Sequence, residues 1–507
     1  MVYIIGAGPG DYKLLTLKAA ECIGKADVVV YDRLVNARIL NLAKKTAELL
    51  YVGKEPHHHA VPQEKINEIL VNKALEGRTV ARVKGGDPFL FGRGGEEAEA
   101  LQERGIPFEI IPGITSAIAA PAYAGIPVTH RDYCSSLHII TGHERPGRES
   151  SFIDYETVAK LEGTLVFLMG LKKLPEICSR LMESGKDPTT PAAVIERGTA
   201  PSQRTVSGTL GTIAEIALRE GIRSPAVTVI GGVAGLGEKL GWFPRGGLAG
   251  KRVLVTRSRE QASKLARRIE EEGGEVIEFP TIKILEPQDY TVVDRALKEL
   301  KEYRWLVFTS VNGVAFFFKR MRENRMDIRS LQGIKLCAVG EATAEELNKL
   351  GLLVEYMPPS YTSGVLLEGL VKTVLPGEQL LVVRGEIGGE TLLEGLKAAK
   401  VPAREIVAYR TLREDPDRDE ILDLLEKKEI DYITFTSSSA VKNFSAIIGR
   451  ENLGELSGAR IACIGPVTLE TARQEGMSGA VMAGVYTIEG LVNKLMELED
   501  GGKDGTD

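Results

Sequence analysis

Cysteines are scarce in this sequence, and they are not arranged as in a disulfide framework or a zinc site. The 507 residues include five cysteines at scattered positions, none of them in a C-x-x-C pair. An odd, scattered set is typical of reduced thiols in the cytoplasm. No apolar run approaches the roughly 18 residues that a membrane-spanning helix needs. The first residues read as a strand and not as a signal peptide, so we expect a cytoplasmic protein.

Two nucleotide-binding signatures are also missing. Residues 6–11 (GAGPGD) begin like a dinucleotide fingerprint, but Asp11 stands where that pattern needs its last glycine. No G-x-x-x-x-G-K-[ST] loop occurs, which excludes a P-loop. The formal net charge of -6 gives no general attraction for nucleic acid or anionic membranes. The sequence therefore favours a small-molecule ligand other than NAD or a nucleoside triphosphate, and any acidic ligand needs local basic clusters.

What the sequence does contain is a pair of glycine-rich loops. Residues 6–11 and 85–94 (GGDPFLFGRG) each follow an apolar run, at 2–5 and 79–83. Glycine lets the backbone approach a ligand closely at the end of a parallel strand. Two such loops favour a single cleft that holds one ligand. The alternative is that each loop is an ordinary tight turn between a strand and a helix.

Short β-branched runs alternate with helical patterns along the whole chain, which predicts α/β domains with parallel sheets covered by helices. For this length we expect about three or four domains. A Gly- and Pro-rich break at 241–250 precedes a fresh strand, so 244–250 is predicted as a linker. The residues 499–507 are predicted as a disordered tail. The main segments expected as strands are 2–5, 28–31, 79–83, 137–140, 164–167, 227–230, 253–256 and 335–339.

The second half contains an internal repeat. Three stretches, at 303–310, 338–343 and 361–370, recur 125 to 127 positions later. This spacing predicts two related α/β lobes with Ser- and Thr-rich loops at their strand ends. Paired lobes of this kind commonly face each other across a ligand cleft. Alternatively, the hydroxyl groups merely cap the helices that follow.

Two residues between the glycine loops are candidates for acid–base chemistry. Asp32 follows an apolar strand directly, and Lys54 follows a glycine at another strand end. A carboxylate at that edge can hold or deprotonate a ligand N–H, and a lysine can bind a carboxylate or donate a proton. The alternatives are a helix cap or surface ion pair for Asp32 and a solvated side chain for Lys54. The run 57–59 (HHH) does not predict a metal site, because adjacent loop residues rarely converge on one ion.

Residues 1 to about 243 resemble uroporphyrinogen-III C-methyltransferases, which belong to the tetrapyrrole methylase superfamily. The GAGPGD loop by itself indicates the superfamily, and the stretches YDRLV, VGK and GGDPFLFGRGGEE narrow the resemblance to this enzyme. Further matching stretches lie at 112–116, 128–133, 167–170 and 196–199. The resemblance implies two α/β lobes, about 1–115 and 116–243. It also implies S-adenosylmethionine (SAM) as the cofactor and a homodimer formed through this half.

The resemblance also implies roles for individual residues. Asp32 and Lys54 would be the acid–base pair in the methylation of uroporphyrinogen III at C2 and C7 to precorrin-2. Two departures, Leu90 for Ile and Arg197 for Asn, leave the activity in place. The implied SAM contacts are Pro9, Gly85, Gly86, Asp87, Leu90, Thr115, Ser116, Met169 and Gly198. The substrate has eight carboxylates, and Arg33, Arg93 and Arg131, with Lys54, are the candidates to bind them, the alternative for each being surface solvation.

Residues 251–498 resemble uroporphyrinogen-III synthases, through VLVTRS at 253–258, the repeated FTS, IVAYRT at 406–411 and IGPVT at 464–468. The resemblance implies one lobe of 251–283 with 410–498, a second lobe of 284–409, and cyclisation of hydroxymethylbilane with inversion of ring D, without a cofactor. Tyr409 is the first choice for the general acid, and a structural tyrosine is the alternative. The residues expected to line the cleft are Thr309, Ser310, Ser437, Ser438 and Thr468.

The two resemblances are consistent with each other, because the product of the second reaction is the substrate of the first. Joining them raises the local concentration of an oxygen-sensitive intermediate. Two alternatives stay open: a methylase acting on a later corrinoid precursor, and a second half that only binds tetrapyrroles. Whether the product continues to sirohaem, cobalamin or haem d1 is also open.

Overall fold

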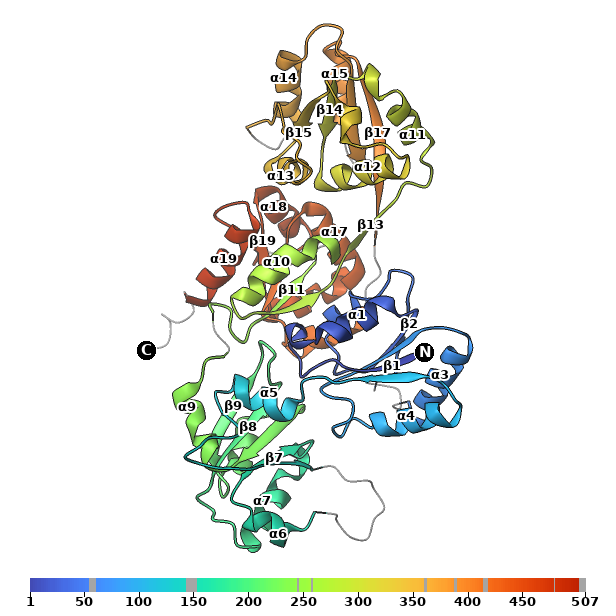
Figure 1. The fold of residues 1–507 in the computed structure, drawn as a ribbon. Helices are drawn as coiled ribbons and strands as arrows, with labels where there is room; N and C mark the ends of the chain where they lie inside the picture. The colour runs from blue at the N-terminus through green and yellow to red at the C-terminus, as the bar shows by residue number, and fades with distance from the viewer. Residues whose placement is uncertain are drawn as a thin grey trace. The chain divides into compact units, whose positions relative to one another are not determined.

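The computed structural model describes residues 1–53, 61–142, 153–243, 246–256, 259–359, 363–386, 390–413, 418–477 and 479–500. The chain forms two compact units, and their main boundary lies between Arg252 and Val253. Four five-stranded sheets make up these units (Figure 1). Within the described residues, no helix is long and apolar enough to span a bilayer.

The first sheet is entirely parallel, as predicted. Its order is β3-β2-β4-β1-β5, formed by β1 (Val2–Gly6), β2 (Val28–Tyr31), β3 (Glu48–Tyr51), β4 (Val80–Lys84) and β5 (Phe108–Ile111). Helices α3 (Gln63–Leu75) and α4 (Gly94–Glu103) pack on one face, and α1 (Leu17–Lys25) and α2 (Ala37–Leu40) on the other (Figure 1). Covering both faces explains why the central strands read as continuous apolar runs.

The second sheet is mixed, which corrects the expectation of parallel sheets throughout. Its order is β6-β7-β10-β8-β9, and β10 runs antiparallel to both β7 and β8. Strands β8 and β9 are antiparallel as well, because the short connection between them cannot hold a helical crossover. The strands are β6 (Leu137–Thr141), β7 (Thr164–Leu168), β8 (Pro191–Glu196), β9 (Arg204–Thr209) and β10 (Ala226–Ile230). The helices are α5 (Ser116–Tyr123), α6 (Tyr155–Lys160), α7 (Leu174–Glu183), α8 (Ile213–Arg219) and α9 (Gly237–Leu240).

The third and fourth sheets form the lobes of the second half. The third has the order β12-β11-β18-β19-β20, from β11 (Arg252–Val255), β12 (Glu275–Glu278), β18 (Tyr432–Phe435), β19 (Arg460–Cys463) and β20 (Val481–Met482). Its helices are α10 (Arg259–Glu271), α16 (Arg418–Glu426), α17 (Ser438–Ile448), α18 (Pro466–Gln474) and α19 (Ile488–Asp500). Because α19 extends through Asp500, residues 499 and 500 are helical and not part of the predicted tail.

The fourth sheet has the order β13-β17-β16-β14-β15, and only β13 is antiparallel. Its strands are β13 (Ile282–Leu285), β14 (Trp305–Phe308), β15 (Lys335–Ala338), β16 (Leu380–Gly385) and β17 (Ala403–Arg413). Its helices are α11 (Thr291–Lys298), α12 (Val311–Glu323), α13 (Glu341–Lys349), α14 (Ser363–Thr373) and α15 (Glu390–Ala398). The chain passes from the third sheet to the fourth between β12 and β13, at 279–281, and leaves the fourth sheet after β17, which ends at residue 413. The expected lobe boundaries, after residues 283 and 409, differ from these positions by a few residues.

The internal repeat is visible in the backbone. Helix α12 follows β14 as α17 follows β18, and each helix begins after a serine. The backbone angles φ/ψ are -163°/157° at Ser310 and -162°/156° at Ser437. The matching sequence stretches therefore build the same local structure in both lobes.

Candidate active sites

In the first half, three loops meet at the carboxyl edge of the first sheet. Gly8 and Gly86 exchange backbone hydrogen bonds, with N···O distances of 3.1 and 2.6 Å. A Cβ atom at Gly6 would lie 2.5 Å from Gly113 Cα, so no larger residue fits there. The Asp87 carboxylate links the same loops, because its Oδ2 accepts from Gly113 N at 3.0 Å. The two glycine-rich loops thus lie against each other, and their holding one ligand stays a prediction.

The loop after β2 lies against this site. A Cβ at Gly85 would be 2.7 Å from Leu34 Cβ, and one at Gly53 would be 2.9 Å from the backbone nitrogen of Arg33. Asp32 comes directly before Arg33 in the same loop. Its side chain is 27% exposed, so a ligand can reach it. Its Oδ1 accepts from Leu34 N at 3.1 Å. Lys54, the other expected acid–base residue, and the histidines at 57–59 lie outside the described residues.

A loop from the second lobe reaches the first glycine loop. The Oγ1 of Thr199, a buried side chain, accepts from Asp11 N at 3.0 Å. Gly198 packs against Ala120 of α5 so closely that a Cβ would overlap the alanine methyl group. Gly198 and Thr199 of the second lobe therefore lie against the first glycine loop.

The loops around this place hold unusual backbone conformations. Among the described residues, three other non-glycine residues with positive φ, at 325, 400 and 428, lie just after helix ends, where the left-handed conformation is common. Elsewhere a positive φ in a non-glycine residue is strained, and such residues cluster at functional sites. Phe91, Arg93, Arg197 and Thr199 lie on these loops, and Met169, which also has a positive φ, follows β7.

The remaining residues expected to contact SAM are placed on the same loops but with fewer contacts. Thr115 caps α5 by accepting from Ala117 N at 3.3 Å, and Ser116 is the first residue of that helix. Pro9 and Leu90 are partly buried. Met169 follows β7 and is 52% exposed, so its place beside the others stays a prediction.

The arginines expected to bind substrate carboxylates differ in their surroundings. Arg33, Arg93 and Arg131 are all exposed. Arg93 in addition forms a two-pronged ion pair with Glu96, at 2.8 and 2.7 Å, and this pairing raises the pKa of its guanidinium. Arg93 would have to leave Glu96, or share it, in order to bind a substrate carboxylate.

In the second half, Tyr409 on β17 lies in a slot formed by three neighbours. Its hydroxyl is 3.1 Å from the Oγ of Ser310, and its ring stacks on Phe316 with centroids 6.0 Å apart. Gly385 forms the floor, because a Cβ there would lie 2.6 Å from the Cζ of Tyr409. The sequence predicted Tyr409 and Ser310 as site residues but gave no reason to single out Gly385 or Phe316.

Two of the five hydroxyl side chains expected to line the cleft, Ser310 and Ser437, cap helices. Ser310 Oγ accepts from Gly313 N at 3.0 Å, and Ser437 Oγ accepts from Ala440 N at 3.2 Å. Thr309 Oγ1 donates to Val383 O at 3.2 Å, and Ser438 Oγ donates to Val467 O at 3.2 Å. Thr468 is buried in the first turn of α18. Capping leaves the loop backbone able to bind anions, so a binding role remains compatible.

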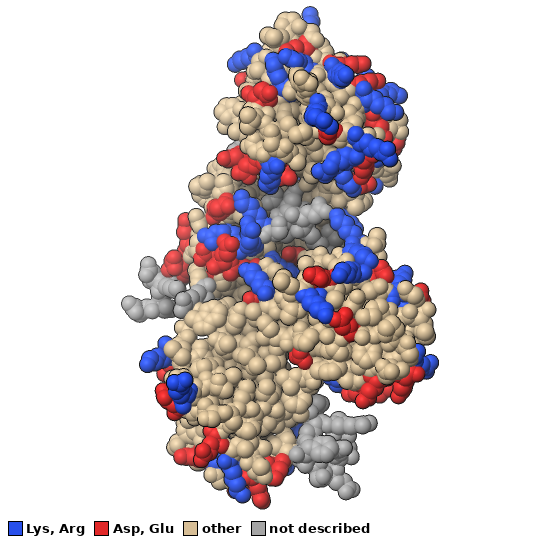
Figure 2. Space-filling view, in the orientation of Figure 1, with Lys and Arg blue, Asp and Glu red and all other residues tan. Residues whose placement is uncertain are grey.

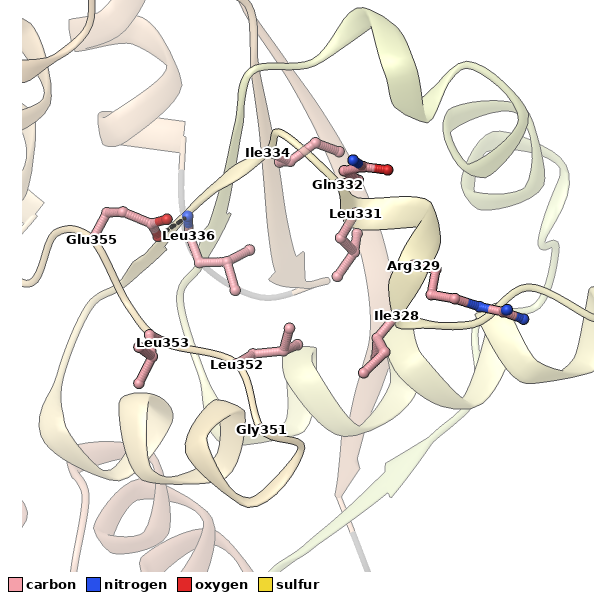
Figure 3. A pocket seen from close by; sticks show the side chains of 10 residues that line it. All are labelled: Ile328, Arg329, Leu331, Gln332, Ile334, Leu336, Gly351, Leu352, Leu353 and Glu355. Atoms are coloured by element: carbon pink, nitrogen blue, oxygen red, sulfur yellow. Dashed lines mark hydrogen bonds between the residues drawn. The ribbon is translucent and has the colours of Figure 1, made fainter.

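A cavity of about 580 Å³ lies elsewhere on the fourth sheet (Figure 3). It is formed by the short helix Ile328–Leu331, strand β15 and the loop at 351–355, where Glu355 accepts from Leu336 N. None of the expected site residues lines it.

On the visible face of the molecule, lysines and arginines are interspersed with acidic residues (Figure 2).

Comparison with known proteins assigns a class to each half. Residues 1–214 match the family described as Tetrapyrrole (Corrin/Porphyrin) Methylases, and residues 263–493 match Uroporphyrinogen-III synthase HemD. The chain therefore joins a tetrapyrrole methylase to a uroporphyrinogen-III synthase, two families of enzymes. These matches confirm the resemblances and the α/β fold class predicted from the sequence motifs.

Individual relatives refine this assignment. The chain is 40% identical over 500 residues to the porphyrin biosynthesis protein HemD of Ruminiclostridium josui, covering 99% of this chain and 98% of that protein. It belongs to the family of that protein. Over 240 residues it is 54% identical to an S-adenosyl-L-methionine-dependent uroporphyrinogen III methyltransferase of Methanosarcina barkeri, covering 47% of this chain and 94% of the relative.

A solved structure is also similar to part of the chain. The uroporphyrin-III C-methyl transferase of Thermus thermophilus, crystallised with S-adenyl homocysteine, is 39% identical. The match covers 46% of this chain and 92% of that one, with a TM-score of 0.40.

Proposed function

We propose that the first half methylates uroporphyrinogen III at C2 and C7 with SAM as the donor, giving precorrin-2. The observation that carries this proposal is the meeting of the two glycine-rich loops and the loop at Gly113 beside Asp32, at the end of a parallel sheet where ligands bind. Support also comes from the relatives named as uroporphyrinogen III methyltransferases.

The proposed reaction needs positioning more than a strong nucleophile. An electron-rich pyrrole carbon attacks the methyl group in line, so that a C–C bond forms as the S–CH3 bond breaks and S-adenosylhomocysteine leaves. The ring nitrogen then carries the positive charge and releases its N–H proton. Asp32 orients the N–H groups and takes this proton, and Lys54 is the other proposed member of the acid–base pair. Arg33 and Arg131 are proposed to bind peripheral carboxylates, as is Arg93 if it exchanges its partner.

The SAM contacts remain those predicted from the sequence, on loops from both lobes. Asp87 would act through the loops, because both of its oxygens already accept backbone hydrogen bonds, from Phe89 N and from Gly113 N. Ordering those loops is what brings the glycine backbone close to the cofactor.

For the second half we propose the cyclisation of hydroxymethylbilane to uroporphyrinogen III with inversion of ring D. Tyr409 protonates the terminal hydroxyl, which leaves as water, and the pyrrole N–H proton that is lost as the azafulvene forms returns to the tyrosine oxygen. The Oγ of Ser310, 3.1 Å from the Tyr409 hydroxyl, can orient that hydroxyl for donation of its proton. Thr309, Ser437, Ser438 and Thr468 are proposed to bind the substrate through their loops.

The test is one anaerobic incubation of the whole protein with hydroxymethylbilane and SAM, followed by isomer analysis and mass spectrometry. A dimethylated type III product is expected if both proposals hold. Unmethylated type III isomer would refute the methylase proposal while supporting the synthase. A type I product would mean that the bilane closed spontaneously, and would refute the synthase proposal.

We further propose that the protein is a cytoplasmic homodimer. Light scattering on the full chain should give about twice the 55.0 kDa of one chain, and a mass of one chain would contradict the dimer. Cell fractionation should recover the protein with the cytoplasm.

A further inference from the structure

A group of buried charges lies next to Asp32, under the glycine loops. Arg82 and Lys84 are on the central strand β4, and Glu97 is on α4; their side chains are 3%, 6% and 0% exposed. Residues two apart on a strand point to the same face, so both cations face α3 and α4. Burying charges is costly unless each has partners, and such groups in a predicted strand are unusual.

Glu97 is the centre of this group. Its Oε1 receives hydrogen bonds from Lys84 Nζ at 2.6 Å, from Arg82 Nε at 3.1 Å and from Gln63 Nε2 at 3.1 Å. Its Oε2 is buried and accepts no hydrogen bond from the part of the chain that the structure describes. The pKa of Lys84 is lowered, chiefly by burial and further by the neighbouring charge of Arg82.

Arg82 connects Glu97 to Asp32, because each of its nitrogens has a different partner. While Nε donates to Glu97, Nη1 donates to Val83 O at 3.1 Å and to Val30 O at 3.4 Å. Nη2 is 3.5 Å from Asp32 Oδ2. A planar guanidinium held at three positions cannot rotate without losing a bond. The other carboxylate oxygen of Asp32 is held by Leu34 N.

We propose that Arg82 is a positioning residue for Asp32, and that Glu97 fixes Arg82 from behind so that the Asp32 carboxylate is correctly oriented for the pyrrole proton. The inference rests on the proposed methylase function. Arg82 Nη2 lies against Asp32 Oδ2 and Leu34 N donates to Oδ1, so the two contacts together set the direction in which the carboxylate points.

Among the described residues, the charged groups of this network that face Asp32 are Arg82 and Lys84 from β4, with Glu97 from α4 behind them. Replacing Arg82 by a neutral residue removes the nearest of these charges. The Asp32 carboxylate then loses the partner of its Oδ2 and is less well oriented toward the pyrrole N–H.

The experiment compares Arg82→Gln and Arg82→Lys with the unaltered enzyme, using SAM and uroporphyrinogen III. For Arg82→Gln we expect a loss of about ten- to a hundredfold in kcat, with the KM for SAM changed less than about twofold. Arg82→Lys, which keeps a charged donor near Asp32, should recover part of the kcat.

Arg78→Gln is the matched control, because Arg78 pairs with Glu48 at 3.2 Å, away from Asp32. Its kcat should match that of the unaltered enzyme. Binding of S-adenosylhomocysteine, measured by calorimetry, shows whether each variant is folded. If Arg82→Gln does not bind it, Arg82→Lys carries the test: a kcat equal to that of the unaltered enzyme would show that the planar guanidinium is not needed, and overturns the proposal.

Two outcomes separate this inference from the proposed function. A kcat that falls together with the affinity for S-adenosylhomocysteine, and that Arg82→Lys does not restore, means a merely structural role for Arg82, and overturns the inference alone. Full methylation by Asp32→Asn, or no methylation by the unaltered enzyme, overturns the proposed role of Asp32 or the methylase function itself.

Discussion

At the scale of single residues, Asp11 shows how one side chain can exclude one function and support another. In the sequence it breaks the dinucleotide fingerprint. In the structure its Oδ1 accepts from Lys13 N at 2.9 Å, and its Oδ2 accepts from the Tyr123 hydroxyl at 3.1 Å. With the Asp11 N–H bound to Thr199, the residue ties the first glycine loop to the second lobe.

Replacing Tyr123 by phenylalanine should therefore weaken this connection. We expect a loss of about 1 kcal/mol in the free energy of unfolding, and a KM for SAM that rises a few-fold. Urea unfolding and initial rates measure the two effects. The exposed Tyr133, changed to phenylalanine in the same lobe, serves as the control.

The same tyrosine predicts a pH dependence. Burial and the neighbouring Asp11 raise the pKa of Tyr123 from 10.0 to about 12. Above pH 10 Tyr123 of the unfolded chain loses its hydroxyl proton, whereas Tyr123 of the folded chain keeps it. The contribution of this pKa difference to the free energy of unfolding is therefore present below pH 10 and is lost by about pH 12. Between pH 10 and pH 12 the free energy of unfolding should therefore fall less for Tyr123→Phe than for the unaltered protein. Identical slopes for the two proteins would contradict the assignment.

At the scale of elements, the repeat builds the same helix start twice but uses it differently. Ser310 and Ser437 cap α12 and α17 with nearly identical backbone angles. Only Ser310 also lies within hydrogen-bond distance of Tyr409. The second copy has kept the cap and has a different neighbour, since Ser437 lies 3.0 Å from Ser439 Oγ.

Changing each serine to alanine should separate capping from catalysis. Each change should cost about 1 kcal/mol of stability because a helix loses its cap. The Ser310→Ala variant should in addition lower the rate of formation of the type III isomer more than Ser437→Ala does. Equal synthase rates in two equally destabilised variants would show that the contact with Tyr409 has no catalytic effect.

The slot around Tyr409 gives a second prediction at this scale. Gly385→Ala should push the tyrosine ring away, because the new methyl group would overlap it, and synthase activity should fall about tenfold or more. The control is Gly364→Ala on α14, where a methyl group meets nothing within 4 Å. Isomer analysis of the product measures the effect, and methylation of added uroporphyrinogen III should stay unchanged in both variants.

At the scale of the whole molecule, the proposed activities lie in different compact units. Asp32 belongs to residues 1–252, whereas Tyr409 belongs to the unit that contains residues 277–497. Each unit has its own hydrophobic cores, and the site residues named in each are held by contacts within that unit.

The two activities should therefore be lost separately. Asp32→Asn should abolish methylation of added uroporphyrinogen III and leave the cyclisation of hydroxymethylbilane intact. Tyr409→Phe should have the opposite effect. Coupled assays on the two variants, and on their mixture, measure this. A mixture that fails to make precorrin-2 would mean that the intermediate does not pass freely between chains.

Much of the fold and part of the sites could be predicted from the sequence. The strands that precede the glycine loops and the break near residue 245 are local patterns, because hydrophobic period and turn residues act over a few residues. The two lobes of the second half follow from matching stretches 125 to 127 positions apart. Asp32 is a candidate because of its place after a strand, whereas Tyr409 and the SAM contacts follow from the family resemblances, and their roles stay predictions. The antiparallel strands of the second sheet were missed because strand direction depends on which strands pair.

The sequence by itself determined the two α/β halves, the families that they resemble and the loops that carry their chemistry. Only the tertiary structure decided what supports those loops: Arg82 and Glu97 beneath Asp32, and Gly385 beneath Tyr409. These residues lie on other elements, up to 65 positions away in the case of Glu97 and Asp32. Charge pairing and close packing act through space. The sequence therefore shows that charged residues lie in a buried strand, but it does not show which partners make them stable there.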